Sequence, residues 1–228
     1  MSFSVRYPQL QDNPLLGGLT IEEQSGLVEH AEILPLARGE CAYQQGENAK
    51  RLGFVISGSF KLFRLTQDGQ EKVFRILLPG DILAEGMLFS INAIHDYTAM
   101  AVETSEVLMF PLEQYHQIIL NNSALSIALL SRLAQLEQDS LETLEILSFN
   151  KSVDRVVRYL VSQGLGSCND CMAPKFELPA TKRLIASQLS IQPETLSRVL
   201  NQLERDGLLL LEGRRICILD LPTLLQHG

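Results

Sequence analysis

A segment near the end of the chain, residues 182–207, has the pattern of two short helices joined by a tight turn. Such a pair needs a small residue inside the first helix, a tight central turn, and apolar positions in the second helix that fix a steep angle. The residues that meet these requirements are Ala186, Ser190, Leu196 and Val199. Pro193 suits the first turn of the second helix, where its missing N–H costs nothing. The segment is therefore predicted to be a helix-turn-helix, a device for reading DNA.

The second helix carries polar groups that match base edges. Arg198 has the planar fork that pairs with O6 and N7 of guanine, Glu194 can accept from N4 of cytosine, and Ser197 can reach a base or a phosphate. The alternative is an ordinary surface pair, because Glu194 and Arg198 are four residues apart. The surrounding helix-turn-helix pattern favours the DNA-reading interpretation.

Two short apolar runs, 208–211 and 215–219, follow the second helix, and Gly213 lies between them. This pattern predicts a hairpin, or wing, directly after the helix pair. It would place Arg214 and Arg215 beside a phosphate backbone. A solvated hairpin turn with no DNA contact is the alternative.

Charge is distributed unevenly along the chain. Lys and Arg total 19 and Asp and Glu total 27, which argues against nonspecific coating of nucleic acid. Residues 151–228 hold 10 basic and 8 acidic residues, whereas residues 1–150 hold 9 and 19. The basic charge therefore belongs to the helix-turn-helix end.

The N-terminal part has the pattern of short strands. From about residue 34 to 111, turn residues recur at the ~8–12-residue spacing of sandwiches and barrels, and the clearest hairpin spans 60–77 around Asp68 and Gly69. We expect an α+β chain with three parts: an N-terminal β-domain over 1–122, a dimerisation helix over 123–149 and a winged helix-turn-helix domain over 150–228.

Residues 123–147 have the spacing of one long amphipathic helix. Its apolar stripe needs a partner, and a second copy of the chain is the simplest one. The predicted dimer contacts are Leu129, Leu133, Leu136 and Leu144. Packing of the stripe against the chain's own β-domain is the alternative.

This order of elements resembles the family of the cyclic-AMP receptor protein and the fumarate and nitrate reduction regulator. The resemblance rests on Pro79-Gly80-Asp81, on the run 84–89, and on a Glu-x-x-Ser-Arg pattern in 194–198. It implies a β-roll resembling the cyclic-nucleotide-binding jelly roll, an inverted repeat TTGAT-N4-ATCAA as the DNA site, a homodimer, and RNA polymerase as a partner. The predicted DNA-binding set is Gln192, Glu194, Thr195, Ser197, Arg198, Arg214 and Arg215.

Departures from the family pattern limit the effectors that this protein is expected to bind. The cyclic-AMP branch holds the cyclic phosphate with an Arg-Ser pair, but here Tyr97-Thr98 stands in that place, so cyclic AMP is not expected. Glu85 remains, without an evident acid or base partner in the sequence. The candidate effector-pocket residues are Glu85, Gly86, Met87, Leu88, Phe89, Tyr97 and Thr98.

No Cys precedes Cys41, so the iron–sulfur cluster of the fumarate and nitrate branch, which takes three N-terminal thiolates, is excluded. The runs 84–89, 156–160 and 190–195 are most similar to the dissimilatory nitrate respiration regulator. That resemblance implies nitric oxide sensing through haem. The histidines are His30, His95, His116 and His227, and their scattered positions single out no haem ligand.

Other motifs point to no further chemistry. Cys168 and Cys171 could form half a zinc site or a redox pair, but two reduced thiols in a loop is the simpler interpretation. No metal site is assigned. A ligand-binding or catalytic β-barrel is the alternative function class, yet no catalytic constellation emerges. The lack of a catalytic constellation predicts that the protein is not an enzyme. The polar first 16 residues and the lack of a membrane-spanning run predict a cytoplasmic protein.

Overall fold

The computed structural model describes residues 13–90, 92–167 and 174–226. The chain divides into two compact units, and the division lies inside one long helix, between Glu137 and Gln138. The expected boundaries at 122 and 149 instead lie beside the two ends of that helix, α5 (Ser123–Ser148). In the described residues, no helix is both long and apolar enough to span a membrane.

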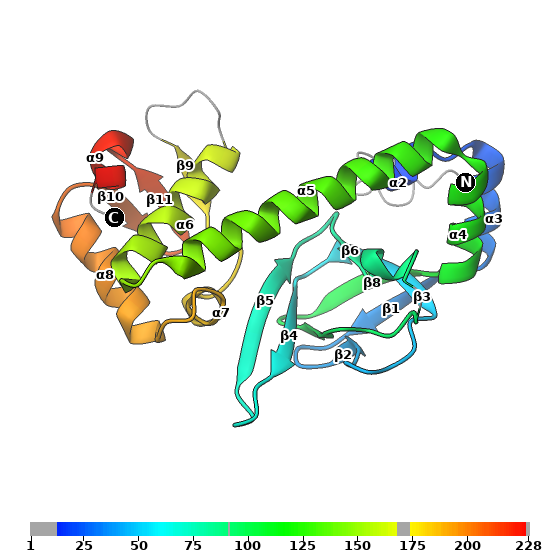
Figure 1. Cartoon of the computed structure of the whole chain (residues 1–228), viewed down its shortest axis with the longest axis horizontal. Coiled ribbons are helices and arrows are strands. Elements are labelled where there is room, and N and C mark those ends of the chain that lie inside the picture. The colour runs from blue at the N-terminus through cyan, green and yellow to red at the C-terminus, as the bar shows by residue number, and fades with distance from the viewer. Residues whose placement is uncertain (1–12, 91, 168–173, 227–228) are drawn as a thin grey trace. The chain divides into compact units, whose positions relative to one another are not determined.

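Two four-stranded sheets form the roll of the N-terminal unit (Figure 1). One has the strand order β1-β8-β3-β6 and the other β2-β7-β4-β5. The strands of the first sheet are β1 (Glu32–Leu36), β8 (Ser105–Pro111), β3 (Arg51–Ser57) and β6 (Ile82–Leu83). The strands of the second sheet are β2 (Cys41–Tyr43), β7 (Thr98–Ala101), β4 (Phe60–Leu65) and β5 (Glu71–Leu77). The antiparallel pairing of β4 with β5 confirms the hairpin expected around Asp68 and Gly69.

The central strands of the first sheet, β8 and β3, are buried on both faces, and their apolar residues accordingly run on without alternating with polar ones. In β3, Val55 packs into the roll interior with Phe60 and Val107, whereas the neighbouring Phe54 packs on the outer face. That outer face is covered by helices and by the start of α5 (Figure 1). The covering helices are α2 (Pro14–Gly17), α3 (Ile21–Glu29) and α4 (Leu112–Asn121).

The turn from β3 to β4 requires glycine. Gly58 has a φ of 78°, in the left-handed region that other residues rarely adopt. A Cβ atom there would lie 2.7 Å from Cα of Ser105. The same turn is closed by the Ser105 hydroxyl, which accepts from the Ser59 N–H at 3.2 Å.

The C-terminal unit combines helices with a three-stranded sheet, β10-β11-β9. Its helices after α5 are α6 (Ser152–Ser167), α7 (Lys182–Gln188), α8 (Pro193–Arg205) and α9 (Leu221–Gln226). Its strands are β9 (Lys175–Glu177), β10 (Leu209–Glu212) and β11 (Arg215–Ile218). The sequence predicted the helix pair and the wing hairpin but not β9, which pairs with β11. The expected α+β class is confirmed.

Candidate DNA interface and effector site

The turn between α7 and α8 is tight and closed by main-chain bonds. The N–H of Ile191 donates to the carbonyl of Ala186 at 3.0 Å. Ser190 has a φ of 55°, so the chain reverses through a left-handed residue. The buried side chains of the two helices are Ile185, Ala186, Leu196, Val199, Leu200 and Leu203. These contacts fix the two helices against each other.

The exposed side of α8 carries the expected reading groups. Its buried residues follow i, i+3, i+4 and i+7 spacing, so Glu194 and Arg198 lie on the opposite side and are exposed. The guanidinium Nη2 of Arg198 donates to the Thr195 hydroxyl at 3.2 Å. In the described part of the chain, no ion pair joins Glu194 to Arg198. Gln192 caps the helix and is exposed, and Ser197 is half-buried.

The two wing arginines have different surroundings. Arg214 donates from Nε and Nη2 to the Leu178 carbonyl, at 3.2 and 2.8 Å, and lies 3.6 Å from the Glu177 carboxylate. The Arg214 guanidinium thus connects the end of β9 to the wing hairpin. Arg215 is exposed, and among the described residues no carbonyl or carboxylate binds its side chain. Arg215 is therefore the better placed of the two for a phosphate.

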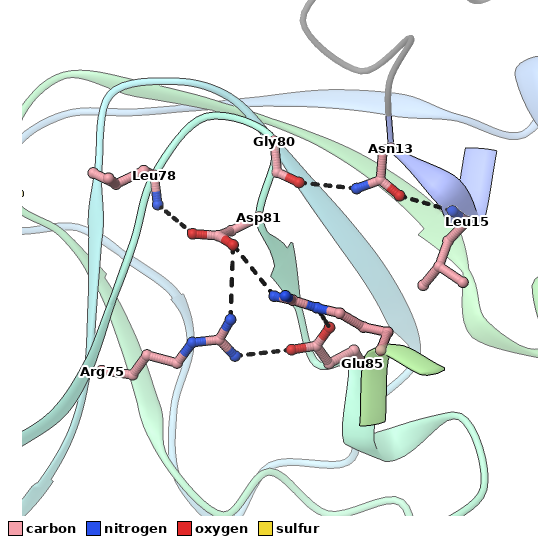
Figure 2. Close-up of polar contacts among 8 residues, drawn as sticks. Asn13, Leu15, Arg75, Leu78, Gly80, Asp81 and Glu85 are labelled. Carbon is pink, nitrogen blue, oxygen red and sulfur yellow. Dashed lines mark hydrogen bonds and ion pairs between the residues drawn. The ribbon is translucent and has the colours of Figure 1, made fainter. Parts of the chain in front are cut away.

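Glu85 lies in a closed group of ion pairs in the N-terminal unit. It is 6% exposed and belongs to the short 3-10 helix η2 (Glu85–Met87). Its Oε1 lies 2.8 Å from Arg75 of β5, and its Oε2 lies 3.2 Å from Nε of Arg132 of α5. Asp81 Oδ1 lies 3.7 Å from Arg75 and 3.3 Å from Arg132. We call these four residues the charge cluster; Figure 2 shows its carboxylates converging on the two guanidinium groups.

The turn that carries Asp81 is itself fixed. The N–H of Leu78 donates to Asp81 Oδ2 at 2.9 Å. The amide of Asn13, before α2, donates to the Gly80 carbonyl at 2.9 Å (Figure 2). The sequence did not predict these ion pairs of Glu85. Two cations lie beside it, and both are already paired with carboxylates of the same chain.

The other predicted effector residues are not brought together at Glu85. Leu88 is buried in the core beneath the helices, whereas Phe89 is exposed and lies edge-on to His116, with ring centroids 4.8 Å apart. Tyr97 packs beside Phe74 and under the Arg64 guanidinium, 4.9 Å from its ring centroid. The Thr98 hydroxyl accepts from the Gln45 N–H at 3.1 Å. Gly86 is exposed and Met87 is half-buried.

The predicted dimer leucines differ in exposure along α5. Leu129 is buried in the core of its own unit, and Leu133 packs against that core. Leu136 is half-buried, whereas Leu144 is exposed. The packing alternative therefore accounts for Leu129. The large apolar side chains that α5 leaves exposed are Ile127, Leu130, Leu141 and Leu144, each between 59% and 65% exposed.

Comparison with protein families finds a match in each unit. A cyclic nucleotide-binding domain matches residues 33–122, and a Crp-like helix-turn-helix domain matches residues 154–227. The transcriptional activator protein FnrA of Stutzerimonas stutzeri is 27% identical over 187 residues, covering 82% of this chain and 76% of FnrA.

Solved structures agree with these matches. The DNR protein of Pseudomonas aeruginosa is 34% identical over the full length of both chains, with a TM-score of 0.53. The chain belongs to the family of the cyclic-AMP receptor protein and the fumarate and nitrate reduction regulator. A CooA mutant from Carboxydothermus hydrogenoformans shares the fold, with a TM-score of 0.78 at 23% identity over 95% of this chain and 96% of CooA. DNR supports the nitrate respiration branch within the family.

Family membership decides the function class. The relatives are transcriptional regulators, and the helix-turn-helix match indicates DNA binding. The protein is therefore a DNA-binding transcriptional regulator and not an enzyme.

The described histidines lie apart from one another in the N-terminal unit. The ring of His95 is buried and stacked on Tyr43, with centroids 3.6 Å apart. His30 Nδ1 lies 3.2 Å from the Gly26 carbonyl on an exposed helix. His227, Cys168 and Cys171 lie outside the described residues. Within those residues, no group of three or more His, Cys, Asp or Glu could hold a metal ion.

Sequence reasoning missed the arginines that organise both units. Arg132 stands among Leu129, Leu133 and Leu136 on one helix face, and a cation within an apolar stripe is a signal that a buried carboxylate faces it. Arg75 gave no such signal, because its partners depend on how β5 and η2 fold together. Arg155 of α6 also gave none, since it binds main-chain carbonyl groups.

Proposed function

We propose that this regulator works as a homodimer that reads an inverted repeat resembling TTGAT-N4-ATCAA, with RNA polymerase as its partner on DNA. The observation that carries the proposal is the exposed pair on α8: Arg198 is steadied by Thr195 and not neutralised by Glu194. A guanidinium free of a carboxylate keeps its donors for guanine.

Each half-site would be read by a few side chains of α8. Arg198 donates to O6 and N7 of the guanine in TTGAT, and Glu194 accepts from N4 of a cytosine. Thr195 and Ser197 lie on the flank of this face, where hydroxyl groups reach the phosphates. Gln192 lies at the N-cap position of α8 and is exposed. Arg215 of the wing adds a backbone contact.

The test is fluorescence anisotropy with three duplexes at fixed salt: the repeat, a scrambled sequence of equal composition, and the repeat with both G·C pairs replaced by A·T. We expect tight binding to the repeat alone. Each replaced pair should cost about 1–3 kcal/mol of binding free energy. Equal affinity for all three duplexes would contradict sequence-specific reading.

The exposed face of α5 supports assembly through this helix. Ile127 and Leu130 are three residues apart, as are Leu141 and Leu144, and Ala134 lies at an intervening position. The run 127, 130, 134, 137, 141 and 144 alternates steps of three and four, the spacing of a two-stranded coiled coil. We propose that this face is the dimer seam. It differs from the face of Leu129, which its own unit buries.

Sedimentation of two variants tests the seam. Leu144→Glu places a carboxylate at a twofold apolar contact, which is costly, so the variant should sediment as a monomer and lose affinity for the repeat. Leu136→Glu, on the half-buried face, is the comparison. A monomer from Leu136→Glu together with a dimer from Leu144→Glu would instead place the seam at Leu133 and Leu136.

We further propose that an effector controls DNA binding at the charge cluster, because the cluster joins η2 and β5 to α5. A ligand shifts the protein between active and inactive forms only if it binds one form more tightly. Any group that competes for Arg132 would release α5 from Glu85 and Asp81. A ligand bound at the cluster would thus act directly on the long helix of this unit.

Titrating candidate effectors into the anisotropy assay tests this control. Cyclic AMP should leave DNA affinity unchanged, because Arg75 and Arg132 are already neutralised. Haem with nitric oxide is the effector implied by the nitrate respiration branch, and we expect it to raise affinity. Anaerobic absorption spectra with and without nitric oxide report whether haem binds in a defined ratio. Spectra that show no defined ratio would remove haem while leaving the DNA-binding proposal intact.

A further inference from the structure

One guanidinium of the C-terminal unit binds three main-chain carbonyl groups. Arg155, in the first turn of α6, donates from Nε to the Phe149 carbonyl at 2.7 Å. Its Nη1 donates to the carbonyls of Leu189 and Ser190, at 3.2 and 3.4 Å. In the part of the chain that the structure describes, no carboxylate lies within ion-pair distance of Arg155.

These carbonyls belong to two places that matter for DNA reading. Phe149 follows the last residue of α5, and Leu189 caps the C-terminal end of α7. Carbonyl groups at helix C-termini lack helical partners and carry partial negative charge, so a cation there is favourable. The rigid guanidinium donates from two nitrogens at a fixed separation, Nε and Nη1, and so reaches both places at once. Arg155 thus joins the end of α5 to the helix-turn-helix turn.

A second arginine holds the same joint. Arg158, one turn further along α6, places its guanidinium 5.4 Å from the ring centroid of Phe149. Phe149 is therefore held through both its carbonyl and its ring, by side chains three residues apart on one helix. The segment 149–151 between α5 and α6 is therefore tied to α6 through Phe149.

We infer that Arg155 is a positioning residue that fixes the direction of α8 relative to the end of α5. The turn it binds lies immediately before α8, which begins at Pro193. Resting on the proposed homodimer and repeat, the inference has a specific consequence. Two reading helices whose direction is fixed against α5 match one spacing between half-sites, because each added base pair rotates the next half-site by roughly 34–36°.

The experiment measures spacer preference with the full-length protein. Repeats with N3, N4 and N5 spacers, a single half-site duplex and a scrambled duplex are titrated with wild type, Arg155→Gln and Arg155→Lys. For wild type we expect a preference for N4. In Arg155→Gln, the N4 preference over N3 and N5 should fall at least about tenfold, the equivalent of about 1.4 kcal/mol, while half-site affinity changes little.

Arg155→Lys should restore part of the preference, because an ammonium group keeps the charge but cannot fork between carbonyls. Two controls separate other roles. Arg205→Gln removes one exposed cation from the last turn of α8, and Val156→Ala destabilises α6 while leaving the guanidinium in place. Both should keep the wild-type spacer preference. Thermal unfolding of each variant confirms that it is folded at the assay temperature.

Several results would overturn the inference. An unchanged N4 preference in Arg155→Gln would do so, as would a loss equal to that of Val156→Ala. Equal weakening on repeat and scrambled duplexes, with a smaller salt dependence, would make Arg155 a phosphate contact instead. A wild-type protein that does not prefer the repeat over the scrambled duplex would refute the proposed function, which is a different outcome from losing the role of Arg155.

Discussion

Two arginines in the N-terminal unit and two in the C-terminal unit use their charge in opposite ways. In the N-terminal unit, Arg75 and Arg132 are mostly buried and each contacts both Glu85 and Asp81. In the C-terminal unit, Arg198 and Arg215 are exposed and no described carboxylate pairs with them. The first pair is neutralised within the chain, whereas the second keeps its charge for another molecule.

This difference explains how an acidic chain can bind DNA. The net charge of −8 is an average over cations that are already occupied and cations that are free. Binding depends on the free ones, because only they can replace the counterions of a phosphate backbone. Total charge therefore says less about the partner of this protein than the pairing of each arginine.

The largest expected effect is a loss of stability when the paired arginines lose one of their carboxylates. Glu85→Gln leaves two mostly buried guanidinium groups with Asp81 as their only carboxylate, so the free energy of unfolding should fall by about 3 kcal/mol. Chemical denaturation measures the change. Glu32→Gln is the matched control, since Glu32 pairs with Arg51 at the surface and its loss should cost under about 1 kcal/mol. Similar small losses from both variants would mean that burial of Glu85 adds nothing.

The next effect is on a free arginine. Arg198→Ala should reduce affinity for the repeat by about 1–3 kcal/mol per half-site and flatten discrimination at the G·C pair, while leaving stability unchanged. Anisotropy on the repeat and on its A·T-substituted form measures both. An equal loss on scrambled DNA would show that Arg198 contacts phosphate.

A smaller effect separates the wing arginines, to which the sequence assigned the same role. Arg215→Ala should weaken binding to all duplexes and lower the salt slope by about one, as for one lost phosphate contact. Arg214→Ala should leave the slope unchanged and lower the free energy of unfolding by about 0.5–1.5 kcal/mol, because its bonds to the Leu178 carbonyl are lost. If Arg214→Ala alone changes the slope, the assignment of the two residues is reversed.

The smallest expected effect is on the pH dependence of stability, through protonation of His95. Burial lowers the pKa of His95 below its ordinary value, and only the nearby Glu47 and Asp96 oppose this. The unfolded chain therefore binds the proton more readily, so stability should fall as pH drops below about 6.5 toward the lowered pKa. His95→Gln should make the unfolding free energy less dependent on pH in that window.

The sequence predicted those elements whose pattern is local. The 60–77 hairpin has its turn residues in place, and the helix expected over 123–147 matches α5 almost to the residue. The helix pair was predicted from Ala186, Ser190, Leu196 and Val199, which lie within 14 residues of one another. Strand β9 was not predicted, because its three residues pair with β11 forty residues later.

The candidate sites divide in the same way. Exposure of Glu194 and Arg198 follows from the helical period of the buried leucines in α8. The pairing of Glu85 with Arg132 could not be predicted from the sequence, because the two residues are 47 positions apart and lie on different elements. Leu129 is buried and Leu144 is exposed, although both belong to the one stripe expected on α5. The helical period places such residues along one face, but it does not show how far along the helix the N-terminal unit covers that face.

Burial of β3 on both faces makes the first sheet a wall shared by two cores. Phe54 and Val55 are adjacent in the chain yet belong to different cores, and both are fully buried. Because protein interiors are close-packed, a change of volume on one side of such a wall must be absorbed on the other. The sheet therefore couples the two cores. A change of volume in the roll interior alters the packing of α4 and of the start of α5 directly, without a moving loop between them.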